Sequence, residues 1–332
     1  MRAPAFWAGP RPGLAARALR PLGAVYGAIA ARRMARGGAR VGVPVICVGN
    51  FVVGGGGKTP AALSLARLLI DMGERVAFVS RGYGGAASQR VVAVDPNAHR
   101  AADVGDEPLL LAEVAPCFVS ADRRAGALAA IAAGASVLVL DDGLQNPSLV
   151  KDLTFAMVDG EAGLGNGLCL PAGPLRAPLA AQLAQVSAVV IVAAAPADAS
   201  VFADKPVLTA RLIPQGDVAA TLAGRRVLAF AGIARPEKFY ATLREIGADV
   251  AATASFGDHH PFSDAEIADL KARAAREHLV LATTRKDAAR LTPEQRRAVT
   301  ALPITLAFDD APRIGAMLRE ALARCRSVRA IP

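Results

Sequence analysis

The sequence is poor in residues that crosslink a chain or hold a metal by themselves. Its 332 residues include only four histidines and four cysteines, and no two cysteines have the spacing of a metal site or a redox pair. We therefore expect reduced, buried thiols, which excludes a small disulfide scaffold and favours a cytoplasmic protein. The cysteines are Cys47, Cys117, Cys169 and Cys325.

No hydrophobic run is long enough to predict a membrane span. The apolar stretch 21–31 falls short of the roughly 20 residues that a spanning helix needs. The stretch 125–140 contains Gly134 and Ser136 and stops at Asp141, so it predicts a helix end followed by a buried strand. Arginines lie on both sides of the first stretch and no clean cleavage site follows, which is untypical of a signal peptide.

Acidic residues are missing from the first 40 positions, which contain eight arginines. The rest of the chain has 30 basic and 29 acidic residues, so the net charge of +9 is an N-terminal feature. Nucleic-acid-binding proteins more often have a basic stripe on the folded body, and we expect no nucleic acid partner. Genomic composition is an open alternative explanation, because arginine outnumbers lysine 32 to 6.

Charged residues are scarce elsewhere, at 20% of the chain, against 53% hydrophobic residues. Such a chain buries a sizeable core and is not disordered. Its length suits two domains better than one. No feature of the sequence indicates an oligomeric state.

The segment 12–36 predicts a helical arm. Apolar residues recur at helical spacing on one face, with Arg17 and Arg20 opposite, and Pro21 is expected to kink or split the helix. Together with its arginines, this face predicts a basic amphipathic arm at an anionic membrane surface. The alternative is that the arm packs on the body. The apolar positions are Leu14, Ala18, Leu22, Val25 and Ile29.

An α/β pattern follows the arm. A strand at 43–48 precedes a glycine-rich turn and a helix over 60–72, and further continuous apolar runs are typical of parallel strands covered on both faces. This predicts a P-loop NTPase-like parallel sheet domain over 41–213, after an arm over 1–40. The further strands are predicted at 75–80, 136–140 and 186–193.

The pattern restarts after residue 213 and predicts a second, smaller α/β domain over 214–332. Ser263 and Glu266 have the spacing of a capping box that begins a helix reaching residue 277. The strands of this domain are predicted at 226–231, 250–255, 279–283 and 304–308, and its other helices at 236–246 and 313–324.

A glycine-rich loop is the strongest chemical signal. Glycines turn backbone N–H groups toward phosphates, a lysine reaches the terminal phosphates, and a threonine hydroxyl ligates Mg²⁺. A strand before the loop and a helix after it support this interpretation. The strict motif has glycine where this chain has Val52. The loop residues are Gly54, Gly55, Gly56, Gly57, Lys58 and Thr59.

Paired carboxylates occur at two other points. Asp141 and Asp142 end a predicted strand, where a P-loop fold holds or supports its Mg²⁺. Asp106 and Glu107 lie in a tight segment, and one would suit a general base for a hydroxyl acceptor. On spacing alone, both pairs fit a turn or a helix cap equally well.

Histidines and arginines in loops complete the candidates. His259 and His260 are adjacent, and adjacent side chains diverge, so at most one is expected to face a reaction centre. Arg81 follows the second strand and Arg176 lies in a proline-rich loop. Either would suit a phosphate clamp, although a loop arginine at such a position is more often solvated.

In this order, the motifs resemble those of the tetraacyldisaccharide 4′-kinase family of lipid A assembly. The resemblance runs from about residue 44 to residue 291. The matching segments are 48–60, Ser80-Arg81-Gly82-Tyr83-Gly84, Gly105-Asp106-Glu107-Pro108, Asp141-Asp142-Gly143-Leu144-Gln145, Gly165-Asn166-Gly167, 170–176, Phe230-Ala231-Gly232-Ile233 and Asp258-His259-His260.

The resemblance implies a kinase that uses ATP and Mg²⁺. Its acceptor would be the 4′-hydroxyl of an acylated glucosamine disaccharide 1-phosphate, at the cytoplasmic face of the bacterial inner membrane. The roles implied by position are phosphate binding for the loop with Lys58, Mg²⁺ binding for Thr59, Asp141 and Asp142, hydroxyl activation for Asp106 with His259 or His260, and charge neutralisation for Arg176.

The chain departs from the family pattern at three positions. The family usually has a hydroxyl residue at Gly56 and proline at Gly257, and it often has glutamate at Arg285. The last departure puts any role of the segment 284–287 in doubt.

Two other classes of protein are alternatives. A P-loop GTPase or ATPase switch of the partitioning or metallochaperone type shares the glycine loop, but the partitioning type has lysine where this chain has Val53. A guanine-binding motif is also absent, since Lys286 lies one place late for it. A non-enzymatic membrane binder would explain the arm and leave the carboxylates unexplained.

Overall fold

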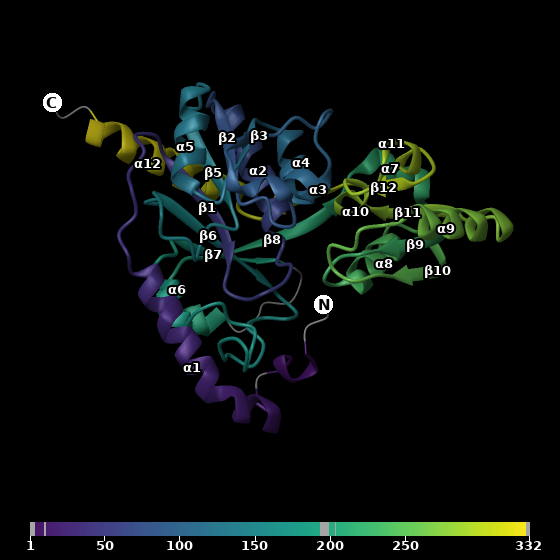
Figure 1. Ribbon diagram of the computed structural model, residues 1–332, viewed down its shortest axis with the longest axis horizontal. Coiled ribbons are helices and arrows are strands. Elements are labelled where there is room, and N and C mark those ends of the chain that lie inside the picture. The colour runs from purple at the N-terminus through teal and green to yellow at the C-terminus, as the bar shows by residue number, and fades with distance from the viewer. Residues whose placement is uncertain (1–3, 10, 193–198, 203, 330–332) are drawn as a thin grey trace.

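The computed structural model describes residues 4–9, 11–192, 199–202 and 204–329, which form two lobes side by side (Figure 1). The larger lobe contains a nine-stranded sheet with the order β13-β8-β7-β6-β1-β5-β2-β4-β3. Its strands are β1 (Val45–Asn50), β2 (Val76–Ser80), β3 (Val92–Ala93), β4 (Cys117–Val119), β5 (Val137–Asp141), β6 (Leu153–Asp159), β7 (Ala188–Val192), β8 (Val207–Pro214) and β13 (Ile304–Phe308).

The centre of the large sheet is parallel and fully buried. β1 pairs in parallel with β5 on one side and β6 on the other, and all of its residues are buried. Val48 packs into the apolar cluster on one face, whereas its neighbour Cys47 packs into the cluster on the other. A strand covered on both faces has a continuous apolar sequence, which is why this strand was predictable.

Helices cover both faces of this sheet. α2 (Lys58–Asp71) and α12 (Ala311–Arg329) pack on one face, and α5 (Arg123–Ala132) packs on the other through Ala127 and Ala130. The other helical segments of this lobe are η1 (Ala5–Trp7), α1 (Leu14–Met34), η2 (Ala86–Gln89), α3 (Ala101–Val104), α4 (Asp106–Ala112), α6 (Leu179–Leu183) and η3 (Ala199–Phe202).

The smaller lobe confirms the predicted second α/β unit. Its four-stranded sheet has the order β10-β9-β11-β12, with α8 on one face and α9 on the other. The capping box is present, because Ser263 accepts the Glu266 N–H while the Glu266 side chain accepts the Ser263 N–H. The elements are α7 (Gly216–Leu222), β9 (Arg226–Ala231), α8 (Pro236–Glu245), β10 (Asp249–Ser255), α9 (Asp264–Arg276), β11 (Val280–Thr284), α10 (Arg285–Ala288), α11 (Pro293–Arg296) and β12 (Thr300–Leu302).

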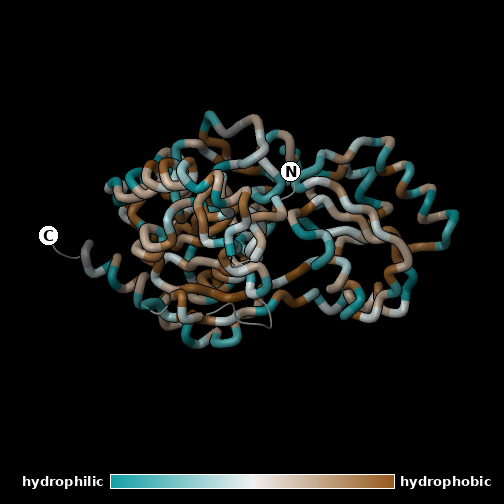
Figure 2. The backbone as a smooth tube through the Cα atoms, turned by 90° about the horizontal axis from the view of Figure 1, so that it is seen from below, coloured by the Kyte–Doolittle hydropathy of each residue, from teal (hydrophilic) through white to brown (hydrophobic). Residues whose placement is uncertain are grey.

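The prediction that the smaller domain continues to residue 332 is wrong. β13 leaves that lobe and pairs antiparallel with β8, from Ile304 opposite Pro214 to Phe308 opposite Ala210. Leu306 of β13 is buried in the core of the larger lobe, together with Ile314 and the rest of the apolar side of α12. The chain therefore leaves the large sheet along β8 and returns beside it. Hydrophobic segments line the interior of both lobes in the view from below (Figure 2).

The predicted arm is a single helix, α1, which runs through Pro21 without splitting. It approaches the body at Gly23 and Gly27, where an added Cβ would lie 2.8 Å from the Cys169 carbonyl oxygen and 3.0 Å from its Sγ. At Gly23 the obstruction is backbone, so a larger residue does not fit; at Gly27 it is a side chain, and the space is tight. α1 therefore packs on the body, as one of the two sequence alternatives states.

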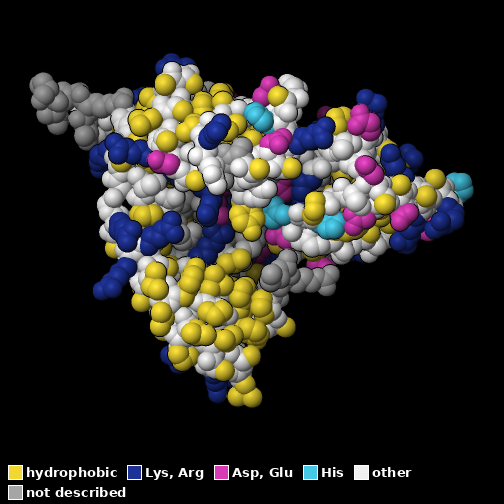
Figure 3. Space-filling model, in the orientation of Figure 1, with side chains coloured by type: hydrophobic (Ala, Val, Ile, Leu, Met, Phe, Trp, Pro, Cys, Tyr) yellow, Lys and Arg dark blue, Asp and Glu magenta, His cyan; other side chains and the backbone are white. Residues whose placement is uncertain are grey.

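The opposite face of α1 is exposed and apolar. Leu14, Leu22, Val25 and Ile29 are 60 to 84% exposed. Hydrophobic side chains gather over this part of the molecule (Figure 3). Within the described residues, no helix has the length and apolar character needed to cross a bilayer.

Candidate active site

The glycine-rich loop joins β1 to α2 at the carboxyl edge of the large sheet. Gly54 and Gly57 have φ angles of 114° and 79°, a region that strongly favours glycine. The Gly54 carbonyl accepts hydrogen bonds from Asn50 Nδ2 at 3.0 Å and from Lys58 Nζ at 3.2 Å. The loop leads directly into α2, and the first N–H groups of a helix have no partner within the helix. The loop and the start of α2 together therefore suit an anion.

The absence of glycine at position 52 has a structural reason. Val52 forms an antiparallel bridge with Leu175, and the next residue, Val53, donates its N–H to the Pro174 carbonyl at 2.9 Å. The first part of the loop is therefore extended and hydrogen-bonded to the segment that contains Arg176. An extended, paired position has no need of glycine.

Thr59 and Asp141 lie together below the loop. Thr59 Oγ1 donates to Asp141 Oδ2 at 3.0 Å, and Asp141 is only 2% exposed. Its other oxygen, Oδ1, is buried and has no hydrogen-bond partner among the described residues. Burial, with smaller contributions from Glu107 and Asp142, raises the pKa of Asp141 to about 7. A buried carboxylate with one unsatisfied oxygen beside a hydroxyl fits a divalent cation.

Asp142 occupies a different environment from its neighbour. Arg176 Nη1 donates to both of its oxygens, at 2.8 and 2.9 Å, and Lys58 Nζ lies 3.9 Å from Oδ1. Burial raises the pKa of Asp142, but the charges of Lys58 and Arg176 outweigh it and leave the pKa below its usual range. Arg176 is fixed further by a hydrogen bond from Nε to the Val52 carbonyl at 3.1 Å. The sequence candidates Lys58, Asp142 and Arg176 thus form one charged group.

A second charged group spans the two lobes. His259 Nδ1, from the smaller lobe, lies 3.0 Å from Oδ2 of Asp106, which is at the start of α4. Asp106 is 3% exposed, and its Oδ1 accepts the Glu107 N–H at 2.9 Å. Burial raises the pKa of Asp106, but the hydrogen bond with His259 and the charges of Lys286 and Arg290 bring it below its usual range. An ionised carboxylate that holds an imidazole is a general-base arrangement.

The two adjacent histidines diverge, as their sequence predicts. His259 has a φ of 57°, faces Asp106 and lies edge-on to the Tyr83 ring. His260 Nε2 instead lies 2.9 Å from Glu266 Oε1, and its ring stacks on Phe256 within the smaller lobe. The geometry therefore brings His259 to the candidate site and keeps His260 away from it.

Two arginines lie near the aspartates. Arg123, at the start of α5, is buried, donates to the Ser120 carbonyl at 2.6 Å and has an unpartnered Nε. Burial and the charge of Arg81 lower the pKa of Arg123 to about 10, although Asp142 and Asp141 oppose this. Arg81 was a sequence candidate, whereas Arg123 was not. Its position at the start of the helix that follows β4, at the same edge of the sheet, was the available signal.

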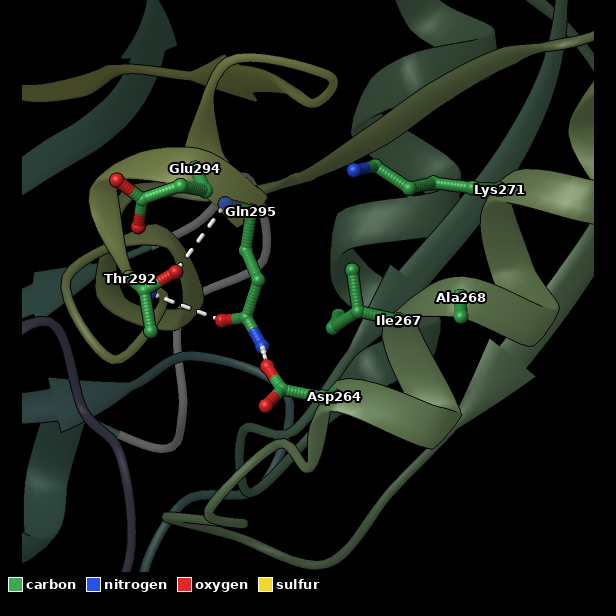
Figure 4. A pocket seen from close by; sticks show the side chains of 7 residues that line it. All are labelled: Asp264, Ile267, Ala268, Lys271, Thr292, Glu294 and Gln295. Atoms are coloured by element: carbon green, nitrogen blue, oxygen red, sulfur yellow. Dashed lines mark hydrogen bonds between the residues drawn. The ribbon is translucent and has the colours of Figure 1, made fainter.

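A cavity of about 420 Å³ lies elsewhere, between α9 and α11 of the smaller lobe (Figure 4). Its polar side chains bind one another, since Gln295 donates its backbone N–H to Thr292 Oγ1 and its Nε2 to Asp264. These bonds cap α11 and join it to α9. We assign this cavity no catalytic role.

Comparison with known proteins identifies the family. The sequence model described as tetraacyldisaccharide-1-P 4′-kinase matches residues 15–323, nearly the whole chain. The chain belongs to this family. The tetraacyldisaccharide 4′-kinase of Methylobacterium radiotolerans is 55% identical over 327 residues, which cover 97% of this chain and 99% of that protein. The one from Nitrobacter winogradskyi is 50% identical over 336 residues and covers 98% and 99%.

A solved structure agrees with this assignment. The crystal structure of LpxK from Aquifex aeolicus in complex with ATP is 28% identical, with a TM-score of 0.73. The match covers 92% of this chain and 99% of that one. The P-loop-like α/β fold and the resemblance to the tetraacyldisaccharide 4′-kinase family are therefore confirmed, and the switch-protein alternative is not supported.

Sequence reasoning assigned no role to several residues of the site. Arg290 Nε lies 3.0 Å from Asp106 Oδ2, and Lys286 Nζ lies 3.0 Å from Glu107 Oε1. Gln145 donates to the Asn50 carbonyl below the loop at 2.7 Å. Lys286 belongs to the segment whose role the sequence left in doubt, and only the contact between the lobes shows where it lies.

Proposed function

We propose that this chain transfers the terminal phosphoryl group of ATP to the 4′-hydroxyl of a tetraacylated glucosamine disaccharide 1-phosphate. The observation that carries this proposal is the convergence of a phosphate-type loop and an Asp106–His259 pair at one edge of the sheet. Glu107 connects the two, because its charge acts on Asp141 and its carboxylate contacts Lys286. A nucleotide on one side and a hydroxyl acceptor on the other fit this arrangement.

The nucleotide side would be formed by the loop and the residues below it. Gly54 to Gly57 and Lys58 would bind the phosphates of ATP, and Thr59 and Asp141, with Asp142 close by, would hold Mg²⁺. Across the described residues, no cluster of three or more His, Cys, Asp or Glu side chains forms a metal site from protein alone. Mg²⁺ commonly takes only one or two carboxylates together with substrate phosphates, where it neutralises charge on the phosphates.

The acceptor side would be formed by Asp106 and His259. In this pair Asp106 is buried and His259 is 27% exposed at its side chain, so the imidazole is the end that an acceptor reaches. The pair would take the proton of the attacking hydroxyl. Arg176, held on Asp142, would offset charge that develops on the transferred group. His260 is no longer favoured for this role.

The direct test is phosphate transfer from ATP to a tetraacyldisaccharide 1-phosphate dispersed in detergent. We expect a product that gains one phosphate at the 4′ position, with GTP as the poorer donor. Hydrolysis of nucleotide without any transfer to the lipid would contradict the proposal and favour a switch protein.

We further propose that the protein attaches peripherally to the cytoplasmic face of the bacterial inner membrane through α1. A lipid acceptor stays in the bilayer, so the enzyme must reach its surface. The exposed apolar face of α1 would enter the interface, and arginines flank it. Each basic residue near anionic lipid contributes about 1 kcal/mol. The exposed arginines are Arg11, Arg17, Arg20, Arg32, Arg33, Arg36 and Arg40.

The triple variant Leu22→Ser, Val25→Ser, Ile29→Ser is expected to lose binding to anionic vesicles in a flotation assay. It should still phosphorylate detergent-dispersed acceptor, because Gly23 and Gly27 keep α1 on the body. Deleting residues 1–36 is a coarser test, since it uncovers that surface.

The matched control is Ile70→Ser with Leu128→Ser. These side chains are 41% and 50% exposed on other helices, and the variant should float as the unmodified protein does. High salt should weaken attachment of the unmodified protein. Full vesicle binding by the α1 variant would move the membrane contact to another surface.

A further inference from the structure

Lys286 links the two lobes at the proposed base. It lies in α10, directly after β11, and reaches across to α4. Its Nζ lies 3.0 Å from Glu107 Oε1 and 3.2 Å from His259 Nε2. The same imidazole therefore contacts Asp106 through Nδ1 and Lys286 through Nε2.

Lys286 is an ammonium ion in this position. Burial lowers the pKa of Lys286, but the carboxylates of Glu107, Asp106 and Asp258 outweigh it and raise the pKa above its ordinary value. An ammonium group has N–H donors and no acceptor. Its contact with His259 Nε2 therefore requires a lone pair on that nitrogen. The imidazole proton is then on Nδ1, where it is donated to Asp106.

We propose that Lys286 is a positioning residue that holds His259 neutral, with its proton on Nδ1, and so keeps the Asp106–His259 pair ready to accept a proton. A positive charge at this distance opposes a second one on the imidazole. A general base works only in its proton-free form. Glu107 gives Lys286 a second partner, so Lys286 can leave Nε2 to the acceptor hydroxyl without losing its ion pair. The inference rests on the proposed role of the pair.

Of the charged groups around His259, Lys286 is the cation that contacts the imidazole directly. His259 contacts Asp106 of α4, Lys286 of α10 and, in its own loop, Asp258, whose Oδ1 lies 3.9 Å from Nε2. Glu107 and Arg290 are one contact further away, Glu107 on Lys286 and Arg290 on Asp106. The carboxylates favour an imidazolium and the cations oppose it. Arg290 is directed at Asp106 and Asp287, which leaves Lys286 as the cation on Nε2.

Nuclear magnetic resonance of the nucleotide-free protein tests this directly. The chain has four histidines, so ¹⁵N-histidine labelling gives few signals, and His259→Gln assigns the relevant one. We expect the neutral imidazole to have its proton on Nδ1. In Lys286→Met, the midpoint of the titration should rise by roughly one to three pH units. Lys286→Arg should restore most of the difference, and an unmoved midpoint in Lys286→Met would overturn the proposal.

Arg285→Met is the matched control. Arg285 is the neighbour of Lys286 in α10 and pairs with Glu113 of the larger lobe, so it also joins the lobes. It has no contact with His259 among those described. We expect the His259 signals to stay in place in this variant. If they move as in Lys286→Met, Lys286 acts only by holding the lobes together, and the proposal is wrong.

Kinetics give the second readout. The acid limb of the pH profile of kcat/KM should move to higher pH in Lys286→Met, with a loss of about tenfold for each unit of displacement. Activity should recover on the alkaline plateau. A uniform loss with an unmoved acid limb would overturn the proposal and indicate direct contact with substrate. If the His259 titration shifts as expected but no lipid is phosphorylated, the proposed function is wrong, and the effect of Lys286 on His259 still holds.

Discussion

Replacing Lys58 with alanine is expected to abolish phosphoryl transfer and leave the fold intact. Lys58 is buried, with Nζ inside the glycine loop at 3.2 Å from the Gly54 carbonyl. Losing a charged contact to the transferring group should reduce turnover by roughly 10²-fold or more. The fold should survive because Asp142 keeps its two hydrogen bonds from Arg176. Transfer to detergent-dispersed acceptor measures the first effect, and thermal unfolding measures the second.

The matched control for Lys58 is Lys271→Ala. Lys271 lines the cavity in the smaller lobe, where we assign no catalytic role, so its loss should leave turnover unchanged. Lys58→Arg keeps the positive charge with a different shape, and we expect it to recover only part of the activity. If Lys58→Ala retained near-normal turnover, the assignment of the loop as the phosphate site would be wrong.

The elements that the sequence predicted are those whose signals are local. β1 and β9 are continuous apolar runs next to glycine-containing turns, and α9 has its capping box. β8 was missed because it is half-exposed and lacks such a run, whereas β6 was missed although it is buried and largely apolar. β13 was recognised as a strand but placed in the wrong lobe. Its partner β8 lies about 90 residues earlier in the chain, and only tertiary pairing decides which sheet a strand joins.

The candidate site also contains residues that a local motif identifies and residues that only tertiary contacts bring together. The glycine loop and the Asp141-Asp142 pair are contiguous motifs at strand ends, so their residue types and spacing identified them. The pairing of Asp106 with His259 joins residues 153 positions apart, and no periodicity indicates it. The choice between His259 and His260 needed the structure, in which Glu266 and Phe256 hold the His260 ring within the smaller lobe. Arg290 lies outside every motif, and the segment that contains Lys286 indicated no role, because the roles of both residues depend on contacts between the lobes.

Asp106→Asn and Asp141→Asn are expected to fail in different ways. Asp106→Asn keeps the shape of the side chain but removes the charge that supports His259, and turnover should fall by about 10²- to 10⁴-fold. ATP affinity should change little, because Asp106 lies on the acceptor side. Lys286 would keep its 3.0 Å contact with Glu107, and Arg285 its pairing with Glu113, so the junction between the lobes should remain.

Asp141→Asn should instead change the dependence on Mg²⁺. Asp141 is bonded to Thr59 and has a buried, unpartnered oxygen, so its loss weakens the proposed cation site directly. Raising Mg²⁺ should restore part of the turnover of this variant and none of that of Asp106→Asn. Asp95→Asn, in an exposed turn, is the control for the same substitution. If high Mg²⁺ rescued Asp106→Asn as well, Asp106 would belong to the metal site, and the assignment of the Asp106–His259 pair as the base would be wrong.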